Sequence, residues 1–185
     1  MDNINVHEHT YVSTLTDEED NTLLNGDNDP THTLKKLKLD NLNRIIIGHI
    51  NINSLRNKFE LLQSMISGNI DILVVTETKL DESFPPPQFK IQGYKLPFRM
   101  DRNQNGGGVI IYVREDIPCR QLNNHKPHGN LEGIFFEINM NKNKWLFFGG
   151  YNPKKEYIVN FVTYISTILH HYIGKYDNIF FYGRF

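Results

Sequence analysis

The 185-residue sequence has a single cysteine, Cys119, and no long hydrophobic run. One cysteine excludes an intrachain disulfide and any zinc site built on paired cysteines. The apolar stretches fall short of the ~18 residues that a membrane-spanning helix requires, and the first residues carry neither the basic nor the apolar segment of a secretory signal. We therefore expect an intracellular protein, nuclear or cytoplasmic, in a reducing compartment and without a membrane partner.

The first 34 residues contain no lysine or arginine. Eight of the 21 acidic residues lie there, so the rest of the chain holds 13 acidic residues beside all 20 basic ones, a formal charge of +7. The stretch up to residue 42 is rich in Asp, Asn and Thr and contains the breaker pair Asp29-Pro30. This composition predicts an acidic disordered leader over 1–42 and one folded domain over 43–185. A domain of +7 suits a nucleic-acid partner, although an ordinary basic surface explains the charge equally well.

Hydrophobic residues make up 39% of the chain and aromatic residues 12%, which is sufficient for a packed core. Short apolar runs indicate buried strands at 44–50, 71–78 and 178–183. Helical spacing of apolar residues predicts helices over 55–67, with Ser54 as N-cap, and over 156–174. The strand–helix–strand order over 44–78 is typical of a crossover unit in a layered α/β fold.

The middle of the chain is rich in strands and turns. Three consecutive prolines make 79–89 a loop. The run GGGVIIYV indicates the second arm of a hairpin over 109–115, with 94–100 as a short or edge strand before it. Further strands are expected at 118–122, 131–140 and 144–152.

Four blocks, in this order, resemble the endonuclease/exonuclease/phosphatase family: GHININSLRNKFELL, DILVVTETKL, GYKLPFRMDRNQNGGGVIIYVRE and WLFFGGYNP. Within that family the sequence is most similar to the endonuclease domain of non-LTR retrotransposons of the jockey type. The resemblance covers about residues 43–183. It implies an α/β fold, the four-layer α-β-β-α sandwich of DNase I, here incomplete at the C-terminus.

The resemblance also implies an activity and its partners. The reaction is Mg²⁺-dependent hydrolysis of a DNA phosphodiester, which nicks one strand for target-primed reverse transcription. Mn²⁺ is the alternative cation and RNA the alternative nucleic acid. A reverse transcriptase domain is the covalent partner implied in the intact element.

Three positions match the family's site residues. Asn51 matches an asparagine that helps to bind metal and phosphate, and Glu77 matches the metal-binding glutamate. Tyr151 matches the tyrosine whose hydroxyl reaches the scissile phosphate, and Asn53 is a weaker candidate for substrate binding. From the residues alone each has a plainer explanation: a turn cap for Asn51, a solvated strand-end charge for Glu77 and a packed aromatic for Tyr151.

The sequence also departs from the family pattern. The family's next block is an apolar strand ending in Gly-Asp-x-Asn, and here that strand ends FYGRF, so Arg184 stands where the aspartate belongs. The later Ser-Asp-His block is missing, and Lys154 takes the place of another family asparagine. Losing one such group commonly costs about 10²–10⁴-fold in rate. We therefore expect an endonuclease-domain fragment that is inactive as a nuclease, with a non-catalytic nucleic-acid-binding remnant or a phosphatase-like phosphoester hydrolase as alternatives.

Other polar residues are better explained as structure or surface. His49 lies within an apolar strand, and His170 and His171 are adjacent on a helix and face different ways. The Gly106–Gly108 run resembles a phosphate cradle, but the Lys-Ser/Thr and helix of a nucleotide P-loop do not follow it. Four basic residues are candidates for phosphate contacts, against the more ordinary solvated face: Lys79, Arg99, Arg102 and Arg114.

Overall fold

The computed structural model describes residues 11–14, 29–123, 131–152 and 158–184. Its elements, in chain order, are β1 (Tyr11–Thr14), α1 (Pro30–Asp40), β2 (Ile47–Asn51), α2 (Phe59–Ile66), β3 (Ile72–Thr76), the 3₁₀ helix η2 (Pro86–Phe89), β4 (Phe98–Met100), β5 (Val109–Val113), β6 (Cys119–Gln121), β7 (Glu132–Met140), β8 (Asn143–Tyr151), α3 (Ile158–Tyr172) and β9 (Asn178–Arg184). They form one sheet of order β1-β2-β3-β5-β4 and a second of order β6-β7-β8-β9.

The predicted crossover unit is confirmed in the first sheet. Strands β2 and β3 are parallel neighbours, with Asn51 opposite Thr76 at their C-terminal ends. The connecting helix α2 buries Leu62, Met65 and Ile66, the apolar face that the helical spacing predicts.

The predicted start of α2 is wrong. The backbone amide of Ser54 donates to Glu77 O at 2.8 Å, and that of Leu55 donates to Thr78 O at 2.9 Å. These bonds hold residues 54–55 against the chain that follows β3, so the helix begins at Phe59 with Lys58 as its N-cap.

The predicted hairpin of β4 and β5 is also present, and the second sheet adds a further hairpin and a second crossover. Strands β4 and β5 pair antiparallel, as the glycine-led run predicts. Strands β7 and β8 form a long hairpin, turning through Asn141 and Lys142 at φ 52° and 66°. Helix α3 connects β8 to β9, which is its parallel neighbour.

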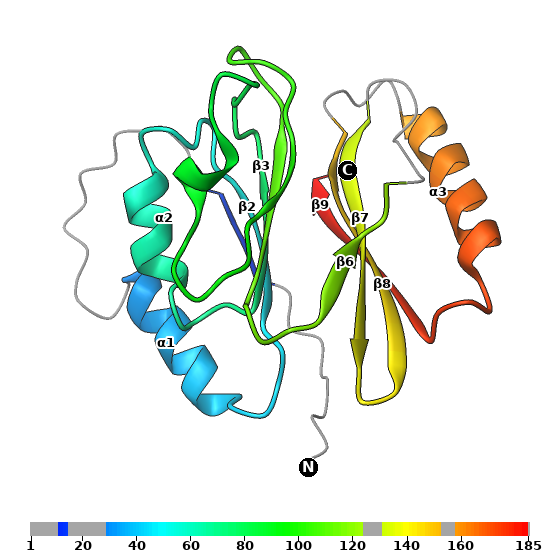
Figure 1. Cartoon of the computed structure of the whole chain (residues 1–185), viewed down its shortest axis with the longest axis horizontal. Coiled ribbons are helices and arrows are strands. Elements are labelled where there is room, and N and C mark those ends of the chain that lie inside the picture. The colour runs from blue at the N-terminus through cyan, green and yellow to red at the C-terminus, as the bar shows by residue number, and fades with distance from the viewer. Residues whose placement is uncertain (1–10, 15–28, 124–130, 153–157, 185) are drawn as a thin grey trace.

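The elements stack as four layers, which confirms the predicted α-β-β-α sandwich (Figure 1). Helices α1 and α2 cover the outer face of the first sheet, and α3 covers the outer face of the second. Three hydrophobic clusters fill the spaces between layers. The first lies between α2 and the first sheet, the second between the two sheets, and the third between the second sheet and α3.

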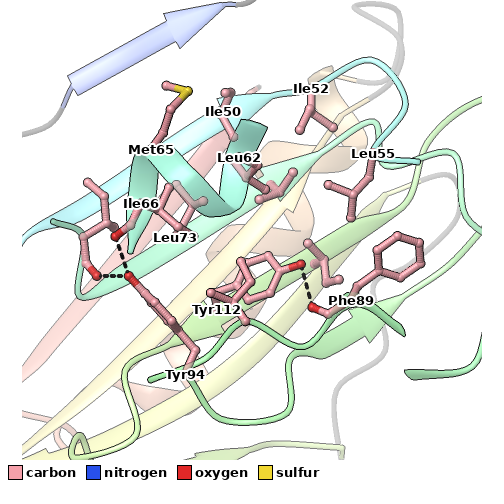
Figure 2. Packing of buried hydrophobic residues seen from close by; sticks show 14 of the residues in the cluster. Ile50, Ile52, Leu55, Leu62, Met65, Ile66, Leu73, Phe89, Tyr94 and Tyr112 are labelled. Carbon is pink, nitrogen blue, oxygen red and sulfur yellow. Dashed lines mark hydrogen bonds between the residues drawn. The ribbon is translucent and has the colours of Figure 1, made fainter. Parts of the chain in front are cut away.

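The first cluster includes two tyrosines whose hydroxyls are satisfied inside the core (Figure 2). Tyr94 donates to the backbone oxygens of Ile66 and Ile70, at 2.8 and 2.5 Å, and so anchors the end of α2. Tyr112 donates to Phe89 O at 3.0 Å and fixes η2 against the sheet. Burial raises the pKa of both tyrosines.

Residues 30–40, which we expected within a disordered leader, form helix α1. Asp29 caps the helix, since its side chain accepts from the amide of Thr31 at 3.0 Å. Lys38 then donates to both carboxylate oxygens of Asp71, at 2.9 and 2.8 Å.

Asp71 is almost fully buried and immediately precedes strand β3. It also accepts from the amide of Ile46 at 2.7 Å and pairs with Arg114. A buried carboxylate requires such partners, so Asp71 ties α1 to the sheet.

Strand β1, which pairs with β2, also lies within the expected leader. Residues 1–10 and 15–28 of that leader lie outside the described residues. No described helix has the length and apolar character needed to cross a membrane.

Candidate phosphate and metal site

The C-terminal ends of β2 and β3 bring two of the predicted site residues together. The strands are parallel, so their ends meet at one edge of the sheet, with Asn51 opposite Thr76. Past the strands, the amide of Ile52 still donates to Thr76 O at 3.0 Å. Asn51 and Glu77, both half-buried, therefore follow neighbouring strands at the same edge.

The backbone at this edge is strained. Asn53 and Glu77 have φ values of 45° and 57°, and Lys79 has 53°, a region that side-chain-bearing residues seldom occupy. Hydrogen bonds to the glycine run maintain this conformation, since the amide of Lys79 donates to Gly107 O at 2.9 Å. Strain held by its surroundings is a feature of functional sites.

The glycine run holds two carboxylates rather than an open cradle. The amide of Gly107 donates to Oε2 of Glu77 at 2.8 Å, and the amide of Gly108 donates to Oε2 of Glu132 at 2.5 Å. Both glycines have positive φ, 74° and 89°. A Cβ at Gly107 would lie 2.5 Å from Glu132 Oε1, and one at Gly108 would lie 2.3 Å from Thr78 Oγ1, so neither position has room for a side chain.

Glu132 also lies at this edge, although it is not among the residues predicted from the sequence. It begins β7 and is nearly buried, and its Oε1 accepts from Nη1 of Arg102 at 2.8 Å. Burial raises the pKa of Glu132 and the negative charge of Glu77 adds to this effect, while the Gly108 amide and Arg102 lower it. One feature of the sequence could have indicated Glu132: it is a carboxylate at the start of the otherwise apolar strand LEGIFF. A buried carboxylate needs a hydrogen-bonding or charged partner.

Tyr151 ends β8 directly opposite Glu132 of β7. The bond from Gly108 to Glu132 joins the two sheets at this end, because Gly108 leads into β5 of the first sheet. The structure thus brings Tyr151 to the end of the sandwich that carries Asn51 and Glu77. The ring of Tyr151 is buried in the core between the sheets, and on its other side the backbone pairs with that of Arg184 in β9.

The oxygen donors suit a hard divalent cation. Glu77 offers a carboxylate with one oxygen held by Gly107, and Asn51 offers an amide oxygen that accepts a 3.3 Å bond from the amide of Asn53. Within the described ranges no three acidic, His or Cys residues are grouped to hold a metal. A cation here would thus have two protein ligands, with water or phosphate completing its shell, as Mg²⁺ sites commonly do. Asn53, the weaker candidate, contacts Asn51 through its backbone amide.

Three other polar candidates have partners elsewhere in the structure. His49 is buried, with Nε2 3.1 Å from Thr76 Oγ1. Arg99 is paired with Asp101, and Arg114 with Asp71 and Asp116.

His170 and His171 lie at the end of α3, where His171 is 3.3 Å from Lys175 Nζ. Arg102 is the basic candidate found beside Glu77. Lys154 lies outside the described residues.

No protein-family model matches the sequence, and no curated protein matches it. Solved structures do. A 3′ phosphatase, NExo, from Neisseria bound to a product DNA hairpin aligns with a TM-score of 0.49 at 19% identity, over 72% of this chain and 54% of that one. The 3′–5′ exonuclease from Neisseria meningitidis gives 0.48 at 19% identity, over 72% and 54%, and an AP endonuclease from Archaeoglobus fulgidus gives 0.46 at 19%, over 72% and 52%. The chain spans about half the length of these structures, and the chemistry of the site rests on its own geometry.

Proposed function

We propose that this chain binds DNA and a divalent cation, Mg²⁺, at the sandwich edge formed by Asn51, Glu77 and Tyr151. The observation that carries the proposal is the position of the three residues at one end of the sandwich. Asn51 and Glu77 follow neighbouring strands of the first sheet, and Tyr151 lies opposite Glu132, which the Gly108 amide bonds to the first sheet. Glu77 and Asn51 would hold the cation, which supplies Lewis-acid stabilisation of phosphate charge when bound. Two backbone amides orient the proposed cation ligands: that of Gly107 binds one carboxylate oxygen of Glu77, and that of Asn53 binds the side-chain oxygen of Asn51.

The sequence resemblance extends this proposal to a retrotransposon-type endonuclease domain acting on a phosphodiester. Tyr151 would direct its hydroxyl toward the phosphate. Arg184 stands where the family pattern has an aspartate, and its backbone in β9 pairs with that of Tyr151. An arginine cannot accept a proton from water at neutral pH, so we propose that the chain retains cation and DNA binding and has lost hydrolysis.

A second candidate function, nucleic-acid binding without a cation, is favoured by the +7 charge that follows the acidic first 34 residues. The two candidates differ in salt and cation dependence. Binding through distributed basic residues weakens steeply with salt and is indifferent to Glu77, whereas binding at the proposed site depends on the cation.

The test is DNA binding with and without Ca²⁺, beside relaxation of supercoiled plasmid in Mg²⁺ or Mn²⁺. We expect binding that is tighter in Ca²⁺ than in EDTA, a cation effect that Glu77→Ala removes, and no nicking above background. Equal binding in both buffers by the wild type would favour the second candidate. Metal-dependent nicking that Glu77→Ala abolishes would overturn the proposed loss of hydrolysis.

A further inference from the structure

One guanidinium at this edge is fixed in place yet keeps part of its hydrogen-bonding capacity. Nε of Arg102 donates to Gly106 O at 2.9 Å, and Nη1 donates to Glu132 at 2.8 Å. Nη2 makes no hydrogen bond within the described part of the chain. The side chain is 41% exposed, whereas its partner Glu132 is 9% exposed. Arg102 is thus held from the protein side and open to solvent.

The free end of that guanidinium lies beside Glu77. A Cβ built on Gly106 would be 2.8 Å from Arg102 Nη2 and 3.8 Å from Glu77 Oε2. These two atoms are therefore no more than 6.6 Å apart, the sum of the two distances. Gly106 leaves this space open, because a side chain there would meet Nη2.

The burial of Glu132 explains why Arg102 stays in this position. A carboxylate at 9% exposure needs a compensating charge, and Arg102 is its ion-pair partner. Glu132 in turn is fixed by the amide of Gly108. Little conformational entropy remains to be lost when Arg102 meets an anion, because two of its nitrogens are already held.

We propose that Arg102 is a phosphate-binding residue of this site, and that Glu132 is its positioning residue. The ligand is a phosphodiester oxygen of the same phosphate that meets the cation at Glu77 and Asn51. This inference rests on the proposed function. A planar guanidinium suits the role, since it donates to phosphate oxygens in a fixed fork and keeps its charge at every accessible pH.

The central test keeps net charge constant. The double variant Arg102→Gln with Glu132→Gln removes the pair without leaving a buried unpaired carboxylate, and a glutamine at position 132 still accepts the Gly108 amide. The matched control is Arg120→Gln with Glu137→Gln. These residues form a second Arg–Glu ion pair, with an N–O distance of 2.9 Å, on the neighbouring strands β6 and β7. Binding of a short labelled DNA duplex is measured by fluorescence anisotropy in Ca²⁺ and in EDTA.

We expect the Arg102/Glu132 variant to bind DNA about 10–100-fold more weakly in Ca²⁺, the range of one charge-assisted hydrogen bond. The slope of log K against log salt should fall by about 0.9 for one lost phosphate contact. The control should bind as the wild type does. Because Arg102 and the cation held by Glu77 would contact the same phosphate, adding Glu77→Gln should cost less than the sum of the separate losses.

Gly106→Ala provides an independent variant that retains every charge. Its new methyl group would lie 2.8 Å from Nη2 of Arg102 and displace it, so it should weaken Ca²⁺-dependent binding in the same direction. Thermal melts of all variants separate this effect from unfolding.

The failures are distinguishable. Cation-dependent binding that Glu77→Gln removes, and that the Arg102/Glu132 variant leaves intact, would overturn this inference alone. Equal weakening by that variant in Ca²⁺ and EDTA, additive with Glu77→Gln, would place Arg102 on a different phosphate and also overturn it. A wild type with no cation dependence would overturn the proposed function, and this inference with it.

Discussion

Replacing Asp71 by alanine tests the claim that one buried carboxylate joins α1 to the first sheet. Asp71 is 1% exposed and accepts from Lys38, from Arg114 and from the amide of Ile46. Removing one member of a buried pair costs about 3–5 kcal/mol. Arg114 is 37% exposed and keeps its partner Asp116, which favours the lower end, about 3 kcal/mol. For a chain of this size that is a fall in Tm of roughly 6–12 °C.

Urea unfolding and thermal melts measure the loss, and hydrogen exchange of α1 amides locates it. Asp116→Ala is the matched control, since its pair with Arg114 is exposed and contributes about 0–1 kcal/mol. Asp71→Asn keeps an acceptor for the Ile46 amide and should fall between the two. Equal, small losses for Asp71→Ala and Asp116→Ala, with unchanged exchange in α1, would refute the reasoning.

Two further predictions concern the glycine run and the second sheet. Gly108→Ala should destabilise the protein by more than the roughly 1–2 kcal/mol of left-handed backbone alone, because its Cβ would also meet Thr78 Oγ1 at 2.3 Å. Gly68→Ala is the control, because Gly68 has φ 75° and its Cβ would have no atom within 4 Å, so it measures the cost of the backbone conformation alone. Equal losses of unfolding free energy for the two variants in urea would contradict the predicted clash with Thr78. Burial alone would raise the pKa of Glu137, but hydrogen bonds from Tyr176 and Arg120 hold it below its ordinary value of 4.5. The stability advantage of wild type over Glu137→Gln should therefore be present above about pH 4.5 and shrink as the pH falls, and a pH-independent advantage would count against it.

Local pattern was sufficient to predict the crossover unit of the first sheet and the hairpin of β4 and β5. The β-branched run ending at Asn51, the helical spacing after it and the second apolar run before Glu77 each encode one element, and parallel pairing places both residues at one edge. The same reasoning placed Tyr151 at a strand end. The resemblance identified which of these polar residues are candidates for a site, because polar residues at strand ends are common and do not by themselves indicate a function.

Features that depend on distant partners were not predictable. Glu132 is held by Gly108, 24 residues away, and by Arg102, 30 residues away, and no local pattern signals either contact. Helix α1 packs only Leu34 and Leu37 against the core and depends on Lys38 reaching a carboxylate 33 residues further on. We predicted a leader over 1–42 from its Asp, Asn and Thr content and the Asp29-Pro30 pair, and that composition does not reveal the contact of Lys38 with Asp71.

The division of two consecutive amides between two carboxylates has a consequence for assembly. Gly107 serves Glu77 of the first sheet, while Gly108 serves Glu132 of the second. The charge environment of Glu77 is therefore complete only after the second sheet has docked, and contacts so distant in sequence form slowly. The proposed binding of a cation at Glu77, followed during refolding, should therefore report the docking of the two sheets and rise later than the helical signal of α2.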